Sequence, residues 1–138
     1  MAISLKTLLV PSKDVEIDYP GFTGFKVKLS FLSRETLVNI RKKATKSTFK
    51  NRQVSEELND ELFLQLYAQA AIKGWSGLKL SYLEQLAPVD LTGENPESEL
   101  DYTEENALFL MKNSANFDAF VSETVTDLGN FQSSNAKK

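Results

Sequence analysis

The sequence contains neither cysteine nor histidine in its 138 residues. Without cysteine the chain forms no disulfide and offers no thiolate nucleophile and no sulfur ligand for zinc. Without histidine it lacks the usual general base near neutral pH and the commonest nitrogen ligand of metals. Most nucleophilic triads and zinc hydrolase sites are therefore excluded. We expect a protein that is not an enzyme and that has no catalytic residue, cofactor or metal.

Long hydrophobic runs are also missing, although 41% of the residues are hydrophobic and 25% are charged, as in an ordinary globular domain. No segment approaches the ~20 apolar residues of a membrane helix. The N-terminus lacks the charged region and long apolar stretch of a signal peptide. We therefore expect a cytosolic protein without a membrane partner. We predict one domain over residues 1–131 and a disordered tail over 132–138.

The net charge of -3 conceals a separation of charge along the chain. Between Arg34 and Arg52 there are seven basic residues and one acidic residue. Between Ser55 and Glu105 there are twelve acidic residues and two lysines. Because such a chain can attract its own copies head to tail, we expect self-association, with each exposed pair contributing little.

Alternation of apolar and polar residues predicts a β-hairpin near the N-terminus. The alternation is unbroken over residues 25–31 and recurs over 15–19. Proline and glycine lie between the two runs and favour a turn there. Residues 3–10 are open between a third strand and a short arm.

Helical periodicity follows the hairpin. Ser33 can cap a helix over about 34–47, and residues 45–54 resemble a polar connection. Ser55 then opens the strongest amphipathic helix, which we predict to end near Lys73. Its apolar stripe, expected at the centre of the core, consists of Leu58, Leu62, Phe63, Leu66, Tyr67 and Ala70.

The second half of the chain contains shorter helical segments. Residues 78–86 are ambiguous, and 89–100 form an acidic loop that lacks the ligand order of an EF-hand, so we predict a solvated loop. Thr103 can cap a helix, and residues 117–128 carry the apolar stripe of a last one. The order predicts an α+β fold, in which an N-terminal β-hairpin or small antiparallel sheet precedes a bundle of four to five α-helices.

A basic run between the first two helices is the strongest candidate for a binding surface. It contains Phe49, whose ring could stack on a nucleic-acid base while the lysines neutralise phosphates. The acidic net charge of the chain disfavours that reading. We predict a protein-contact patch instead, formed by Arg41, Lys42, Lys43, Lys46, Lys50 and Arg52.

The only tryptophan, Trp75, follows Gly74, which suits a left-handed helix C-cap. Tryptophan can lie at the centre of an interface. Beside the predicted helix end, Trp75 better fits a core residue whose indole N–H donates to a backbone carbonyl. Farther along, the chain reads tyrosine-threonine-glutamate-glutamate-asparagine before an apolar helix. The positions that define this arrangement are Trp75, Gly77, Leu78, Tyr102, Asn106 and Leu108.

This arrangement resembles that of the tail assembly chaperones of long-tailed (siphovirus-type) bacteriophages. The resemblance implies a non-enzymatic, self-associating protein of the host cytoplasm that is absent from the mature virion. It implies the phage tape measure protein as a client to be kept soluble and the tail tube protein as a further partner. It also implies that the matched positions maintain the fold. The alternatives are a structural virion component of the tail or head-tail region and a small nucleic-acid-binding regulator.

Overall fold

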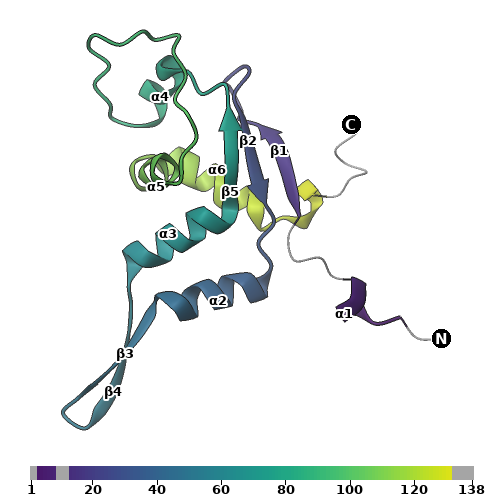
Figure 1. Cartoon of the computed structure of the whole chain (residues 1–138), viewed down its shortest axis with the longest axis vertical. Coiled ribbons are helices and arrows are strands. Elements are labelled where there is room, and N and C mark those ends of the chain that lie inside the picture. The colour runs from purple at the N-terminus through teal and green to yellow at the C-terminus, as the bar shows by residue number, and fades with distance from the viewer. Residues whose placement is uncertain (1–2, 9–12, 132–138) are drawn as a thin grey trace.

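A three-stranded antiparallel sheet and the helices packed around it build this α+β fold. The computed structural model describes residues 3–8 and 13–131 (Figure 1). The sheet has the order β1-β2-β5, formed by β1 (Asp14–Asp18), β2 (Lys26–Ser30) and β5 (Ile72–Ser76). The helices are α1 (Leu5–Leu8), α2 (Arg34–Ala44), α3 (Asp60–Ala71), α4 (Leu80–Leu86), α5 (Glu104–Asn113) and α6 (Ala115–Val125), and a 3₁₀ turn, η1, covers Leu128–Phe131.

The predicted hairpin is confirmed as β1 and β2, with Ile17 opposite Val27. The third strand, however, is β5, which the sequence analysis assigned to a helix end and a turn. Gly74 lies in this strand opposite Lys28, so the predicted left-handed C-cap is wrong. Pairing with β5 satisfies the second edge of β2, which would otherwise expose unpaired backbone groups. Residues 3–8 form no strand, and the remainder of the 3–10 segment lies outside the described residues.

Side-chain caps set the starts of four helices. Ser33 and Thr103 accept hydrogen bonds from the backbone N–H groups of Thr36 (3.2 Å) and Asn106 (2.9 Å), as the sequence predicted. Asn59 caps α3 in the place predicted for Ser55. Ser114, 2% exposed, ends α5 and also caps α6, because its Oγ accepts from the N–H of Phe117 (3.1 Å).

Residues 45–58, predicted as a connection and a helix start, form a second antiparallel hairpin, hereafter the β-arm. Its strands are β3 (Thr45–Lys50) and β4 (Gln53–Leu58), and it projects from the ends of α2 and α3 away from the sheet (Figure 1). The two turn residues, Asn51 and Arg52, both have positive φ (53° and 63°). These angles indicate a type I′ turn, whose twist matches that of an antiparallel hairpin.

The core lies between the sheet and helices α3, α5 and α6. The α3 stripe contributes less to it than predicted, because Tyr67, Ala68 and Ala71 are the buried residues of this helix. Leu66 is only half-buried, and Leu58 is exposed on β4. The largest fully buried side chains are those of Phe25, Phe117, Leu29, Ile72, Leu78, Val27, Val121 and Val125.

Substitution of Gly77 tests how closely the segment after β5 approaches the turn between β1 and β2. The φ of Gly77 is +74°, and an added Cβ would overlap the carbonyl oxygen of Gly24. Gly93 has a similar φ of +83° but open space around an added Cβ. Gly93→Ala should therefore cost only the left-handed strain, about 1–2 kcal/mol. Gly77→Ala should cost about 2–5 kcal/mol, because overpacking adds to that strain. Urea denaturation measures both, and equal losses would contradict a tight approach.

Candidate functional site

The fold brings together the residues that carried the family resemblance. Trp75 Nε1 donates to the carbonyl oxygen of Leu100 (2.9 Å), which confirms the predicted indole hydrogen bond. Tyr102 packs edge-on against the Trp75 ring at 5.2 Å between centroids, and its hydroxyl donates to the carbonyl oxygen of Ile72 (3.1 Å). These contacts attach the chain before α5 to β5.

The remaining matched positions extend this attachment. Leu78 is fully buried, and its carbonyl oxygen accepts from the N–H of Leu100 (2.8 Å). The Asn106 side chain donates to the carbonyl oxygen of Asp101 (3.0 Å), and Leu108 is half-buried. These contacts hold residues 100–102, which end the loop before α5, between β5 and the start of α5.

Local contacts also organise the acidic loop. Lys79 Nζ lies 3.1 Å from Glu97 Oε1. The hydroxyl and N–H of Thr92 donate to one oxygen of Asp90, and these bonds hold the pKa of that carboxyl below its usual value. Over residues 3–8 and 13–131, no group of three or more acidic side chains is placed to hold a metal ion.

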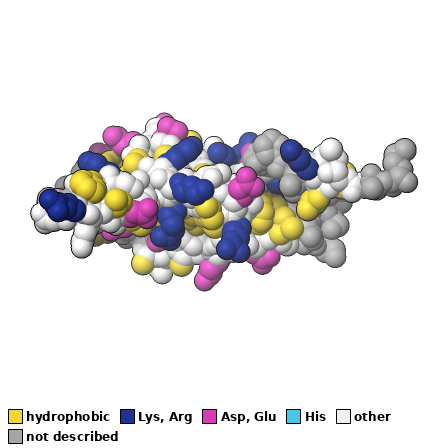
Figure 2. Space-filling view, turned by 90° about the horizontal axis from the view of Figure 1, so that it is seen from below, with side chains coloured by type: hydrophobic (Ala, Val, Ile, Leu, Met, Phe, Trp, Pro, Cys, Tyr) yellow, Lys and Arg dark blue, Asp and Glu magenta, His cyan; other side chains and the backbone are white. Residues whose placement is uncertain are grey.

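The predicted basic patch is distributed over two elements. Lys42 and Lys43 lie exposed in the last turn of α2, where the Arg41 guanidinium lies 5.7 Å from the centroid of the Phe63 ring. Lys46 belongs to β3 and Arg52 to the turn of the β-arm, while the side chain of Lys50 lies outside the described part of the structure. On the face shown in Figure 2, basic side chains lie among acidic and hydrophobic ones.

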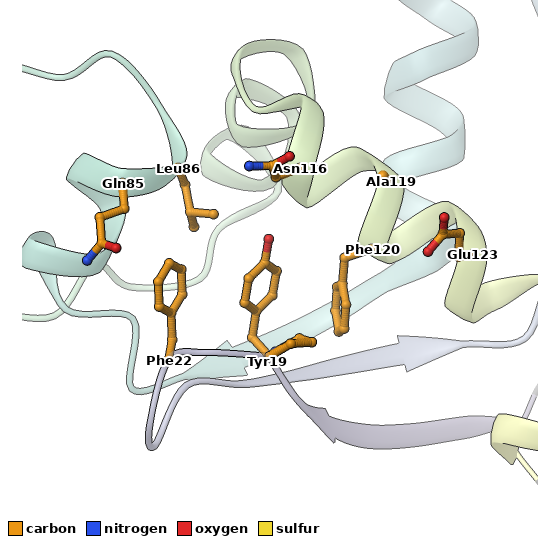
Figure 3. Close-up of a pocket in the computed structure, with 9 residues that line it drawn as sticks. Tyr19, Phe22, Gln85, Leu86, Asn116, Ala119, Phe120 and Glu123 are labelled. Carbon is orange, nitrogen blue, oxygen red and sulfur yellow. The ribbon is translucent and has the colours of Figure 1, made fainter.

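An open depression lined by aromatic rings lies where the β1–β2 turn meets α4 and α6 (Figure 3). We call it the aromatic hollow. Its volume is about 430 Å³. It is lined by Tyr19, Pro20, Phe22, Gln85, Leu86, Asn116, Ala119, Phe120 and Glu123.

Stacked rings form the floor of the aromatic hollow. The Tyr19 ring lies between Phe22, 5.1 Å away and nearly parallel, and Phe120, 4.6 Å away (Figure 3). On the far side of Phe22, Tyr82 of α4 stacks at 4.9 Å. The Tyr82 hydroxyl donates to the carbonyl oxygen of Thr23 (2.8 Å), so the row of rings is attached to the turn at this end. Such a row offers a rigid apolar surface.

The Tyr19 hydroxyl is the chemically distinctive group of the aromatic hollow. Tyr19 is only 8% exposed, and Figure 3 shows its hydroxyl pointing into the hollow. Among the described residues, no hydrogen bond joins this hydroxyl to another group. Burial raises the pKa of Tyr19 above its ordinary value. Like any tyrosine hydroxyl at neutral pH, it is protonated and can both donate and accept.

The rim of the aromatic hollow is polar. Gln85 and Asn116 present amides, and Glu123 presents a carboxylate. The arrangement can bind an apolar side chain on the rings and a hydrogen-bonding or cationic group at the rim. The sequence analysis missed this site. The aromatic residues on both sides of the Pro20-Gly21 turn were its available signal, but Phe120 joins them only in the fold.

A second, more apolar groove lies between α4 and α5. Its volume is about 320 Å³, and Phe109 at its edge is 51% exposed. The other lining residues are Leu83, Ala87, Pro88, Val89, Leu100, Asn106, Leu110 and Asn113.

The fold described above is that of a small α+β protein. None of the helices in the described residues is long and apolar enough to cross a bilayer. Residues 27–138 match the model of a family described as YdaY prophage protein. The chain belongs to this family and is therefore of phage origin, which agrees with the coarser part of the resemblance. Searches of curated proteins and of solved structures each gave no significant match.

Buried tyrosines should make the fold sensitive to alkali. Burial raises the pKa values of Tyr67, Tyr19 and Tyr102 above their ordinary value. Each folded-state pKa then exceeds the unfolded one, so the stabilisation is complete below pH ~10 and is lost as pH rises through the folded values. We expect the free energy of unfolding, measured in urea, to fall above pH ~10. Tyr67→Phe should reduce the slope of that decline, and an unchanged slope would contradict the assignment.

Proposed function

We propose that this prophage protein is a non-enzymatic tail assembly chaperone that keeps the phage tape measure protein soluble. In this proposal it also helps recruit tail tube subunits, acts in the host cytoplasm and is absent from the mature virion. Membership of the prophage family and the matched arrangement around Trp75 support the phage context. The observation that carries the binding role is the aromatic hollow, with the Tyr19 hydroxyl directed into it.

The chemistry of the aromatic hollow favours a particular kind of client segment. A lysine or arginine on an amphipathic helix can lay its aliphatic stem along the Tyr19 and Phe120 rings. Its cationic head can then reach Glu123, while the Tyr19 hydroxyl accepts or donates one further hydrogen bond. A long helical client such as the tape measure protein presents many such segments.

The size of the aromatic hollow fits a holding role better than tight recognition. A volume of about 430 Å³ accommodates one or two side chains rather than a whole helix. Each contact is therefore weak and reversible. Several copies bound along one client would gain strength through effective concentration, and they would release the client when tail subunits compete for it.

Co-expression with the tape measure protein tests this function. We expect the soluble fraction of the client to rise when this chain is present in excess, and to fall again with Tyr19→Phe or Glu123→Lys. Both changes affect the aromatic hollow, and Glu123 is exposed, so the charge reversal should alter stability by only ~0.5 kcal/mol. Glu94→Lys, an equal charge change in the exposed acidic loop, is the matched control and should leave client solubility unchanged.

Two outcomes would contradict the proposal at different levels. If the tape measure protein aggregates equally with and without this chain, the chaperone role is wrong. Abundance of the chain in purified particles would then favour a structural virion component. If client solubility rises but Tyr19→Phe and Glu123→Lys match the control, the chaperone role stands and the binding site is elsewhere; Phe109→Ser then tests the groove between α4 and α5.

A further inference from the structure

The β-arm is largely exposed, and within the described residues both of its outer edges are free. In the described part of the chain it is a two-stranded sheet without a third strand. Phe49 and Val54, cross-strand partners near its tip, are 72% and 71% exposed. A two-stranded ribbon leaves half of its backbone N–H and C=O groups unpaired along its outer edges. Isolated hairpins of this kind are only marginally stable in water, so an additional strand would stabilise the arm.

The two edges of the β-arm carry opposite charge. Strand β3 contains Lys46, whereas β4 contains Glu56 and Glu57. Within the arm, Lys46 already lies opposite Glu57. Two β3 edges would bring basic strands together, and two β4 edges would bring acidic strands together. Only a β3 edge against a β4 edge places opposite charges side by side.

We propose that the β-arm is the contact between copies of this chain, with β4 of one copy pairing antiparallel with β3 of the next. The proposal goes beyond the chaperone role, because it concerns the contact between copies and holds whichever client is bound. Each copy offers one β3 edge and one β4 edge. The contact is therefore head to tail and can repeat as an open series or a ring.

The backbone limits this contact to registers that join outward-facing groups. Asn59 N–H donates to the carbonyl oxygen of Ala44 (2.8 Å) at the base of the arm. In an antiparallel pair, residues whose backbone groups bond across the pair alternate with residues whose backbone groups point away from it. Starting from this bond, the backbone groups of residues 47 and 49 in β3, and of 54 and 56 in β4, point away from the arm. When the outward backbone groups of two copies pair, each residue can face the same partner residue in the next copy as it faces within its own arm.

The same register makes the side chains of the two copies complementary. Glu57 then lies between Lys46 of its own copy and Lys46 of the next, which gives a line of alternating charge across the sheet. On the opposite face, Val54 lies beside Phe49 of the next copy, and their apolar surfaces cover one another. The arm thereby gains both charge pairing and burial of its exposed apolar side chains.

Complementary charge variants of the full chain test the contact by sedimentation velocity. The unmodified protein should associate at low salt and dissociate at a few hundred millimolar, where screening is strong. Lys46→Glu places glutamates at both facing positions, 46 and 57, and Glu57→Lys places lysines at both, so each variant alone should associate about tenfold more weakly. An equimolar mixture should regain association, because the two kinds of edge again match. The double variant K46E/E57K should also associate with itself.

Single cysteines provide a test that leaves the charges unchanged, because the chain has no cysteine of its own. In the proposed register Thr48 lies opposite Ser55 of the next copy, whereas Ser47 lies on the other face of the arm. A mixture of Thr48→Cys and Ser55→Cys copies should form a mixed disulfide dimer under mild oxidation. A mixture of Ser47→Cys and Ser55→Cys copies should not. Equal yields from the two mixtures, or an unmodified protein that stays monomeric at low salt and high concentration, would overturn the proposal.

Discussion

The antiparallel pairing of β5 with β2 is the interaction on which the rest of the structure depends. It places Trp75 opposite Val27 and completes a sheet whose first two strands are local. The chain that leaves β5 then passes Gly24 so closely that only glycine fits at position 77. It continues into α4, whose Tyr82 ring stacks on Phe22 at the edge of the aromatic hollow. One nonlocal strand pairing thus positions both the family motif and the candidate binding site.

Local signals account for what the sequence could predict, and nonlocal contacts account for what it could not. The first hairpin, the Ser33 and Thr103 caps and the Trp75 hydrogen bond follow from alternation, cap chemistry and burial. Strand β5 contains a lysine and a glycine and carries little intrinsic β preference; it pairs because β2 presents a free edge. The β-arm escaped prediction because Ser55 and the two glutamates after it imitate a helix start, and because its turn has no glycine.

The candidate site shows the same division. Tyr19 and Phe22 are neighbours around one turn, so their proximity could be predicted, but Phe120 comes from α6 and Gln85 from α4. No periodic pattern relates these segments to one another. The basic run is divided between two elements for a related reason: α2 ends at Ala44, and the residues beyond it extend along the β-arm. The prophage family agrees with the phage context of the resemblance.

Ser114 joins the helix that lines the apolar groove to the helix that lines the aromatic hollow. This one buried residue terminates α5 and caps α6, so the two helices share a joint without a flexible linker. Phe109 and Leu110 of α5 line the apolar groove, and Phe120 and Glu123 of α6 line the aromatic hollow. The angle between α5 and α6 at this joint therefore sets how far apart the groove and the aromatic hollow lie.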